Sequence, residues 1–395
     1  MSALTHGGLG RRIAYYRSVV RPKMTQRQLA EAACVSLGTI RKIERGERGV
    51  TDATLEAIAG ALGVDPGRLR TDRGSSHTAV QDALPALSAA IAAYDVPDEG
   101  PIQPLSDLRT AVEEVVRWRL AAQYTRIARR VPDLLVELAR AYHQCPAHER
   151  PELAQLLVSA YRSADAVAYK YGAFDLSARL VELMRWAVPE AGDPLLTSSV
   201  AYVRTETFFA ARSHVSGLRA LEQALDTGPS PDTPLNAAMR GALHMRAAVI
   251  AGRACDVSAA RTHLAEARTL ADQAPEGVYY GTAFGPDSVR IHEVSVAVSL
   301  GDDHVGHALG IAREWKPPGD LPAERRSGFY IELARAQLWS GRADHAFESL
   351  KVARRIAPQH TREHPWVRED AATLRRLKRA DSESLTNFAE WCAAT

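Results

Sequence analysis

The sequence predicts an all-α protein with a small N-terminal helical bundle followed by a longer array of helices. Two observations support this class. Apolar residues recur at helical spacing along most of the 395 residues, and a pattern of alternating apolar and polar residues, which is typical of strands, is almost absent. Pro and Gly interrupt the helical segments every 12 to 22 residues or so from about Leu105 onward.

Composition and charge narrow the class of protein further. Hydrophobic residues make up 46% of the chain and charged residues 24%, as in ordinary folded proteins. No apolar run approaches the roughly 18 residues of a spanning helix. The four cysteines lie far apart without a CxxC pair, which favours a reducing compartment. We therefore expect a cytoplasmic protein.

The charge is unevenly distributed between the two parts of the chain. Residues 1–75 carry 13 basic and 7 acidic residues, whereas the remainder carries 36 basic and 40 acidic residues. A basic N-terminal part on a mildly acidic body indicates that the N-terminal part contacts a polyanion.

Five short helices are predicted within residues 1–70. The first runs from about Leu9 to Val20. Thr25 is expected to cap the second helix, with Gln28 as its capping-box partner, and Ser36 to cap the third after a Cys34-Val35 turn. A fourth helix is predicted from about Thr51 to Leu62, and a short fifth follows Asp65-Pro66. Two helices joined by so short a turn form a helix-turn-helix.

Residues 71–107 are predicted to be a linker with a short helix at 79–94. A polar TDRGSSH segment precedes this helix and a Pro/Gly-containing loop follows it. Residues 108–395 are predicted to form one all-α domain that senses a ligand and dimerises.

The C-terminal domain contains a degenerate internal repeat. Its clearest unit is YIELARAQLWSGRADHAFESLKVARRIAP, with small residues at Ala334 and Ala346, a turn at Gly341 and a stop at Pro358. These spacings are those of a tetratricopeptide unit. Weaker units have anchors at residues 217, 260 and 306. A tetratricopeptide-like helical superhelix with a concave inner face is implied.

Residues 9–69 resemble the lambda-repressor/Cro-like (XRE) helix-turn-helix family. The resemblance rests on Thr25-Gln26-x-x-Leu29-Ala30, Val35-Ser36, Ile40-x-x-Ile43-Glu44-x-Gly46 and Leu55-x-x-Ile58-Ala59-x-x-Leu62. It implies sequence-specific binding of double-stranded DNA, with the third helix in the major groove. It also implies that Glu44 pairs with a basic residue of the first helix, which we identify as Arg17.

The predicted DNA-contacting residues lie on the second and third helices. Leu37 and Gly38 stand where family members more often have polar residues, and Cys34 stands where Gly is usual. Base readout is therefore expected to depend mainly on Arg41 and Lys42. The full set is Gln26, Arg27, Ser36, Leu37, Gly38, Thr39, Arg41, Lys42 and Arg45.

The combination of both domains resembles bacterial regulators of two kinds, actinobacterial XRE regulators with helical-repeat domains and, more distantly, peptide-sensing quorum regulators. It implies a homodimer on an inverted-repeat operator and a small-molecule or peptide effector. The repeat frame selects residues of each inner helix for the concave face: Ser199, Tyr202, Glu206, Phe209, Met245, Val249, Ile291, Ser295, Arg335 and Leu338. This lining is mostly apolar with one acid and one base, and residues 278–284 are expected to fold over it as an aromatic lid.

Three alternatives remain open at this point. The repeat domain is either a sensor or a docking platform for a protein partner, and an aromatic closed pocket would favour the sensor whereas an open polar groove would favour docking. The N-terminal helical bundle either binds DNA or makes contacts with proteins only. An enzyme is disfavoured because HExxH, GxxxxGK[ST], strand-linked GxGxxG and GxSxG are absent. His143, Cys145 and His148 provide at most three zinc ligands, and we predict no metal and no cofactor.

Overall fold

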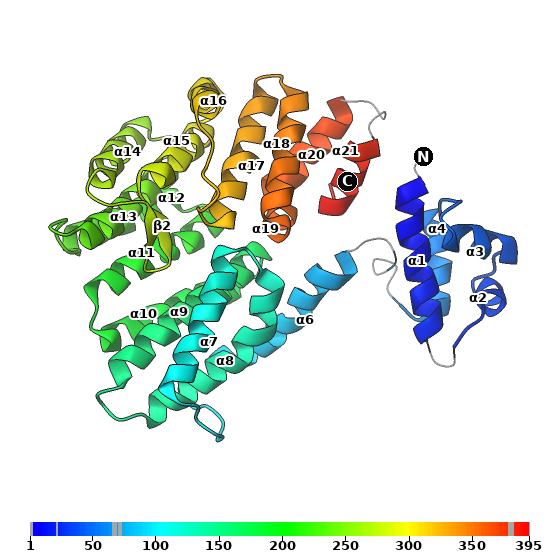
Figure 1. The fold of residues 1–395 in the computed structure, drawn as a ribbon, viewed down its shortest axis with the longest axis horizontal. Helices are drawn as coiled ribbons and strands as arrows, with labels where there is room; N and C mark the ends of the chain where they lie inside the picture. Colours follow the sequence, from blue (N-terminus) through cyan, green and yellow to red (C-terminus); the bar gives the residue numbers. More distant parts are fainter. Residues whose placement is uncertain (1–2, 21–22, 65–68, 70–72, 378–382, 395) are drawn as a thin grey trace. The chain divides into compact units, whose positions relative to one another are not determined.

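The computed structural model describes residues 3–20, 23–64, 69, 73–377 and 383–394. In these residues it has twenty α-helices, one 3-10 helix and a single two-stranded antiparallel hairpin (Figure 1). The predicted all-α class is confirmed. None of the described helices is both long and apolar enough to cross a membrane.

The chain divides into two compact units, residues 1–79 with 371–395, and residues 80–370. Helix α6 (Arg73–Ala92) begins six residues before the predicted helix at 79–94, and α7 (Leu105–Leu120) begins where the sequence pattern placed it. The predicted domain limits at residues 70 and 107 stay predictions.

The N-terminal unit begins with four short helices: α1 (Ala3–Val19), α2 (Gln26–Ala32), α3 (Leu37–Glu44) and α4 (Asp52–Leu62). The side chains of Thr25, Ser36 and Thr51 accept hydrogen bonds from the first turns of α2, α3 and α4. Thr25 and Gln28 form the predicted capping box. The predicted fifth helix after Asp65-Pro66 begins outside the described residues.

The turn between α2 and α3 requires a left-handed residue, and Cys34 provides it with φ +54°. This conformation explains why the position favours Gly. The side chain of Cys34 is exposed. Its backbone conformation turns the side chain away from the core, which Leu29, Ile40, Ile43 and Ile58 fill.

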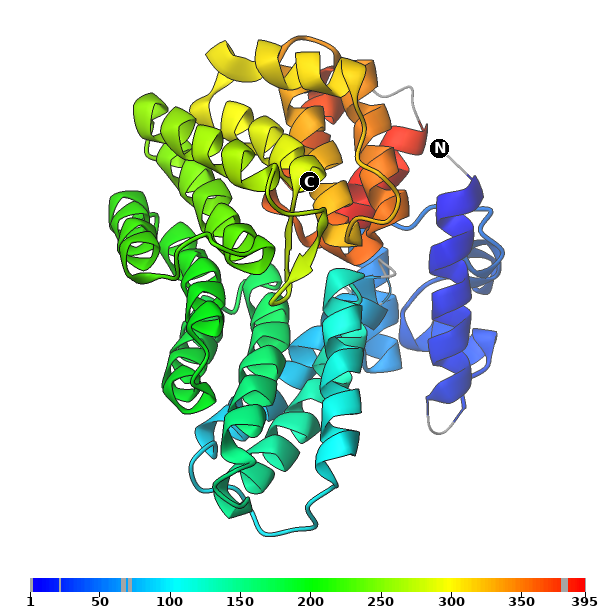
Figure 2. The same ribbon diagram turned by 60° about the vertical axis from the view of Figure 1, so that its left-hand side comes forward.

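The larger unit is an array of helices connected by short turns (Figures 1 and 2). Their bounds are α8 (Tyr124–Gln144), α9 (Arg150–Lys170), α10 (Phe174–Ala191), α11 (Pro194–Ala210), α12 (His214–Thr227), α13 (Pro234–Arg253), α14 (Val257–Ala271), α15 (Pro286–Leu300), η1 (Asp302–His304), α16 (Val305–Glu314), α17 (Ala323–Trp339), α18 (Ala343–Ile356) and α19 (Pro358–Glu363). Helices α20 (Pro365–Leu377) and α21 (Glu383–Cys392) end the chain.

The residues that predicted the clearest repeat unit lie on α17 and α18, in the turn between them and at the start of α19. Ala334 on α17 and Ala346 on α18 are fully buried, and small side chains allow two helices to approach closely. Gly341 adopts φ +72° in the connecting turn, which favours Gly. Pro358 opens α19 after α18 has ended.

A hairpin interrupts the helices between α14 and α15. Its strands are β1 (Gly277–Tyr279) and β2 (Thr282–Phe284), with Val278 opposite Ala283. Tyr280 and Gly281 both have positive φ, +47° and +74°, as a tight two-residue hairpin turn requires. Phe284 is fully buried and packs where a Cβ at Gly241 would lie, 2.0 Å from its Cζ. The absence of a side chain at Gly241 therefore positions the hairpin on α13.

Candidate functional site

Helix α3 presents a basic face opposite its buried face. Ile40 and Ile43 are buried in the core of the N-terminal unit, whereas Arg41, Lys42 and Arg45 are exposed. The predicted DNA-contacting cations thus lie together on one exposed side of a helix whose other side is fixed by packing. A helix of this kind fits the major groove, which is about 12 Å wide.

Some of the remaining predicted DNA-contacting residues are exposed, and the others already make contacts within the protein. Arg27 and Gly38 are exposed, and Leu37 packs partly against the core. Ser36 caps α3, and its hydroxyl lies 2.9 Å from that of Thr39. These two hydroxyls are thus already engaged within the protein.

Glu44 connects three helices of the N-terminal unit. Arg17 on α1 donates to both carboxylate oxygens of Glu44, at 2.7 Å and 3.0 Å. Gln26 at the start of α2 donates to Glu44 Oε2 at 2.7 Å. The predicted pairing of Glu44 with Arg17 is confirmed. In this structure the Gln26 amide, predicted to contact DNA, positions the two helices of the motif relative to α1.

The larger unit contains a cavity of about 230 Å³. Side chains reach it from α7, α9, α11, α13, α15, α17 and α19, and residues of the hairpin close one side. Of the predicted ligand contacts, six lie at this cavity: Tyr202, Glu206, Phe209, Val249, Ile291 and Ser295. Their role in binding stays a prediction.

Four of the ten residues selected for the concave face are not in the cavity lining. Ser199 accepts a hydrogen bond from Arg162, and for the other three the reason is helical register. Met245 is fully buried among core residues. Arg335 pairs instead with Glu369 at 2.6 Å and Asp370 at 2.9 Å, and Leu338 is not part of the lining. Helix α17 reaches the cavity with its first turns, through Glu324, Arg325, Gly328 and Glu332, and the repeat frame selected residues further along the helix.

The predicted apolar character of the lining is wrong. Six basic side chains, four acidic side chains and three histidines line the cavity: Arg119, Arg162, Lys170, Arg246, Arg253, Arg325, Asp165, Glu206, Glu324, Glu332, His292, His360 and His364. Arg119, Arg162, Asp165 and Lys170 escaped the sequence analysis because α7 and α9 were outside the repeat units. The signal was present in α9, where Arg162 and Asp165 interrupt an otherwise apolar stretch.

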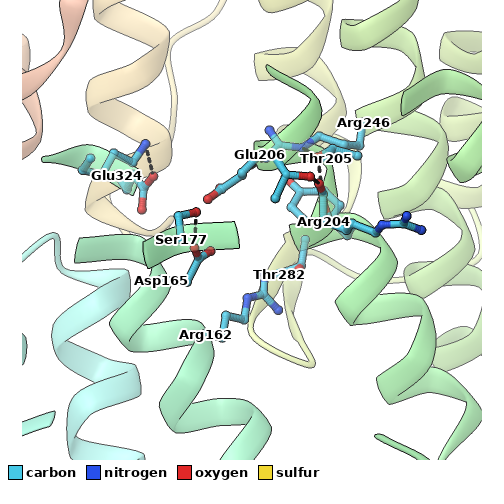
Figure 3. A network of polar contacts seen from close by, with 12 residues as sticks. Arg162, Asp165, Ser177, Arg204, Thr205, Glu206, Arg246, Thr282 and Glu324 are labelled. Carbon is cyan, nitrogen blue, oxygen red and sulfur yellow. Dashed lines mark hydrogen bonds and ion pairs between the residues drawn. The ribbon is translucent and has the colours of Figure 1, made fainter. Parts of the chain in front are cut away.

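Arg162 and Arg119 hold the turn of the hairpin. Arg162 Nη1 donates to Ser199 Oγ at 2.8 Å and to the Tyr280 carbonyl at 2.5 Å, and Nη2 donates to Thr282 Oγ1 at 2.6 Å. Figure 3 shows Arg162 directed toward Thr282. Arg119 Nη2 donates to the Gly281 carbonyl at 2.9 Å.

The hairpin is therefore anchored at the cavity, but it is not an aromatic lid. Gly281 and Ala283 are its residues in the lining. The Tyr279 hydroxyl donates to the Pro275 carbonyl and the Tyr280 hydroxyl to Asp193 Oδ2. These hydrogen bonds direct both rings to other partners.

The ring of Tyr202 lies among three guanidinium groups. Arg246, Arg162 and Arg325 lie 4.6, 5.9 and 5.9 Å from its centroid, within the range of cation–π attraction. Burial alone would raise the pKa of the Tyr202 phenol, but Arg325 and Arg246 outweigh burial and lower this pKa. The ring thus lies in a strongly positive environment.

The four carboxyl groups of the cavity compensate this charge only in part. Glu324 pairs with Lys170 at 2.8 Å. Burial favours its neutral form, but Lys170 and His360 lower its pKa, so it is ionised. Glu206 pairs with Arg246 at 3.3 Å.

Burial raises the pKa of the other two carboxyl groups, those of Asp165 and Glu332. Burial, with Glu206 nearby, raises the pKa of Asp165 well above its usual value, although Ser177 donates to it at 2.6 Å (Figure 3). Burial raises the pKa of Glu332 to about 7. At neutral pH the ionised carboxylates are therefore outnumbered by the basic side chains.

The histidines of the cavity are neutral at pH 7. Burial, followed by the charge of Arg325, lowers the pKa of His292 to about 3. Burial and the charge of Lys170 lower the pKa of His360 to about 3. Within the described part of the chain, no cluster of three or more His, Cys, Asp or Glu residues has the geometry to hold a metal ion. At the HQCPAHE segment, the His143 Nε2 lies 2.9 Å from the Tyr94 carbonyl.

Comparison with protein families identifies a part of the N-terminal unit. Residues 21–69 match a protein-family model described as helix-turn-helix. Among solved structures, the chain is similar to Bacillus thuringiensis PlcR, described in complex with the peptide PapR7 and DNA, with 11% identity, a TM-score of 0.29 and coverage of 96% of this chain and 99% of the other.

A second solved structure gives a similar result. It is the apo form of the competence regulator ComR from Streptococcus vestibularis, with 12% identity, a TM-score of 0.31 and coverage of 95% and 100%. Scores this low support no conclusion about function. No curated protein matches the sequence. The conclusion rests on the family match and on the capped α2–turn–α3 geometry: residues 21–69 form a helix-turn-helix domain of the XRE type.

Proposed function

We propose that this chain is a sequence-specific DNA-binding transcription regulator whose larger unit dimerises and binds a small-molecule effector. The observation that carries the DNA-binding part is the exposed basic face of α3, with Arg41, Lys42 and Arg45 opposite the buried Ile40 and Ile43. In a helix-turn-helix this face reads base edges in the major groove.

The sensing part is supported by the cavity of about 230 Å³. A polar lining was our expectation for a docking groove. However, Arg119 and Arg162 are each only 8% exposed, and a cavity of this volume does not admit the surface of a folded protein. The burial of these charged groups and the small volume favour a small ligand over a protein partner.

The first experiment tests DNA recognition. We expect Arg41→Ala combined with Lys42→Ala to abolish preference for DNA sequences selected from a random pool by the unmodified protein. Arg261 and Arg313, which are exposed on α14 and α16, provide a control double alanine variant that removes the same charge. Equal sequence preference in both double variants would refute the assignment.

Affinity for the selected DNA should also fall steeply with salt. If a dimer neutralises about 6 to 10 phosphates, log K plotted against log[salt] has a slope of about −0.9 per phosphate contacted. A salt-independent affinity is incompatible with the proposal.

The dimer is proposed because one helix-turn-helix contacts a single half-site. We expect protection of two half-sites in inverted orientation, separated by about one helical turn or a multiple of it. Light scattering of the free protein and footprinting of the complex check this. A mass near 43 kDa at micromolar concentration, with one protected half-site, would contradict it.

Coupling of the cavity to DNA binding is testable with the native host's extract. We expect a component of the extract to change DNA affinity because it binds two states of the protein unequally. The combined Tyr202→Ala and Phe209→Ala variant should bind DNA in the absence of extract and lose the response. If extract changes the DNA affinity of this variant as much as that of the unmodified protein, the cavity does not mediate regulation.

A further inference from the structure

Three arginines, of which Arg119 and Arg162 are buried and Arg325 is half-buried, surround one end of the cavity. Arg119 on α7 and Arg162 on α9 flank the hairpin turn, since a Cβ at Gly281 would lie 2.6 Å from Arg119 Nη2 and 3.2 Å from Arg162 Nη1. Arg325 on α17 and Arg162 each lie 5.9 Å from the Tyr202 ring centroid. Three helices that are distant in sequence thus each place a positively charged side chain at the same end of the cavity.

These three arginines have only neutral hydrogen-bond partners. Arg119 and Arg162 donate to carbonyls of the hairpin turn and to hydroxyls, and Arg325 donates to the Tyr202 hydroxyl and contacts His292. Among the residues that the structure describes, no carboxylate lies within 4 Å of any of the three. Arg119 Nε is buried without an acceptor.

Two other arginines with little exposure have carboxylate partners. Arg335 pairs with Asp370, and Arg17 pairs with Glu44. Glu206 and Glu324 act on these arginines without pairing with them directly, and burying an ionised group without a directly paired counter-charge is costly. Burial and the neighbouring Arg119 lower the pKa of Arg162 to about 9, which leaves it charged at pH 7. The excess positive charge is therefore concentrated at this end of the cavity.

The other walls of the cavity are partly apolar. Val203, Phe209, Val249 and Ile291 contribute side chains to the lining. A cavity of about 150 Å³ admits benzene, so the observed 230 Å³ accommodates a molecule of roughly ten non-hydrogen atoms. A molecule of this size fits within the cavity as a compact apolar group that carries one charged group.

We propose that the cavity binds a small organic oxyanion, a carboxylate or a phosphate monoester with a compact apolar body, whose charged group lies among Arg119, Arg162 and Arg325. Guanidinium groups recognise both oxyanions through paired N–H donors. The inference rests on the proposed ligand-binding function and specifies the chemistry of that ligand.

The experiment uses calorimetric titration of the full chain at constant ionic strength. The probes are benzoate and phenyl phosphate, and benzamide is the control because it matches benzoate in size and shape but has no charge. We expect one binding site per chain for at least one anion, and binding of benzamide at least tenfold weaker. Equal binding of benzoate and benzamide, or no saturable binding of either anion, overturns the proposal.

Two variants test the residues. Arg325→Gln and Arg119→Gln should each weaken anion binding at least tenfold. Arg140→Gln is the matched control, since Arg140 is 9% exposed, close to the 8% of Arg119, and donates to the carbonyls of Asp98 and Pro101, away from the cavity lining. Unchanged anion affinity in both cavity variants overturns the assignment of these residues. If a variant fails to fold, the comparison of benzoate with benzamide in the unmodified protein decides.

The outcome is distinguishable from failure of the proposed function. Anion binding that leaves DNA affinity unchanged would support the site and refute regulation through it. Sequence-specific DNA binding without anion binding would support the regulator and refute this ligand class.

Discussion

Arg325 Nη2 on α17 donates a hydrogen bond of 2.5 Å to the phenolic oxygen of Tyr202 on α11, across 123 residues of sequence. Tyr202 is 4% exposed and Arg325 is half-buried, so this bond joins a half-buried cation to a buried tyrosine. It connects two helices on different sides of the cavity.

Replacing Tyr202 by Phe should destabilise the larger unit, because Arg325 loses its closest acceptor while the ring and its packing stay. A hydrogen bond to a charged group contributes about 1.5–3 kcal/mol. We expect a decrease of this size in the free energy of unfolding, measured by urea denaturation. Tyr279→Phe is the control, since that hydroxyl donates to a backbone carbonyl near the surface. Equal decreases in the free energy of unfolding for the two variants would show that the charge of Arg325 does not strengthen this hydrogen bond.

Glu44→Ala should loosen the helix-turn-helix domain. The substitution leaves Arg17, which has 17% of its side chain exposed, without its carboxylate, and it removes the acceptor of Gln26. We expect a loss of about 2 kcal/mol in local stability, seen as faster amide hydrogen exchange in α2 and α3 of the full chain, with α8 and α9 unchanged. Glu47→Ala breaks an exposed pair with Arg45 and should change exchange little. Unaltered exchange in the Glu44 variant would contradict the bridging role.

Anion affinity should fall as the pH rises through 7. Glu332 faces Ser295, Arg253 and Arg325, and its pKa is raised to about 7 by burial. Below pH 7 the group is neutral and the positive charge of the cavity is undiminished, whereas above pH 7 it becomes a competing anion. We expect benzoate to bind about three- to tenfold more weakly at pH 8 than at pH 6.

The Glu332→Gln variant is the control for this pH dependence. His292 and His360, with pKa values of about 3, do not titrate between pH 6 and pH 8. The Gln variant should therefore bind benzoate equally at both pH values. A pH dependence that persists in this variant would assign it to another group.

The same group makes stability depend on pH. The folded-state pKa of Glu332 is raised above its ordinary value near 4.5, so folding favours the protonated form. Its contribution is therefore fully present below about pH 4.5 and is lost as the pH rises through about 7. Glu332→Gln should abolish this loss in urea denaturation between pH 5 and pH 8.

Gly241→Ala should displace the hairpin from α13. The new methyl group would lie 2.0 Å from Phe284 Cζ, and overpacking of this kind typically costs 1–3 kcal/mol. Because Arg119 and Arg162 donate to the hairpin turn, anion affinity should fall with stability. Gly310→Ala on α16, where no atom lies within 4 Å of the added methyl group, should be neutral or stabilising. An unaffected melting temperature for Gly241→Ala would contradict the packing role.

The sequence by itself determined the local structure of the N-terminal unit. The capping residues Thr25, Ser36 and Thr51 and the buried residues Leu29, Ile40 and Ile43 all specify structure within a few residues of themselves. Such interactions are encoded by spacing, so they are readable without tertiary information. Even the contact between Arg17 and Glu44 followed from a resemblance that covers the whole motif.

The chemistry of the cavity was decided only by the tertiary structure. Periodicity identified the inner helices and six of the lining residues, but it gave neither the end of α17 that reaches the cavity nor the arrival of Arg119 and Arg162 from α7 and α9. A helix turns about 100° per residue, so small errors in register or packing rotate a side chain from a cavity into a core, as for Met245. Charge accumulates from helices far apart in the chain, and only their packing brings these arginines together.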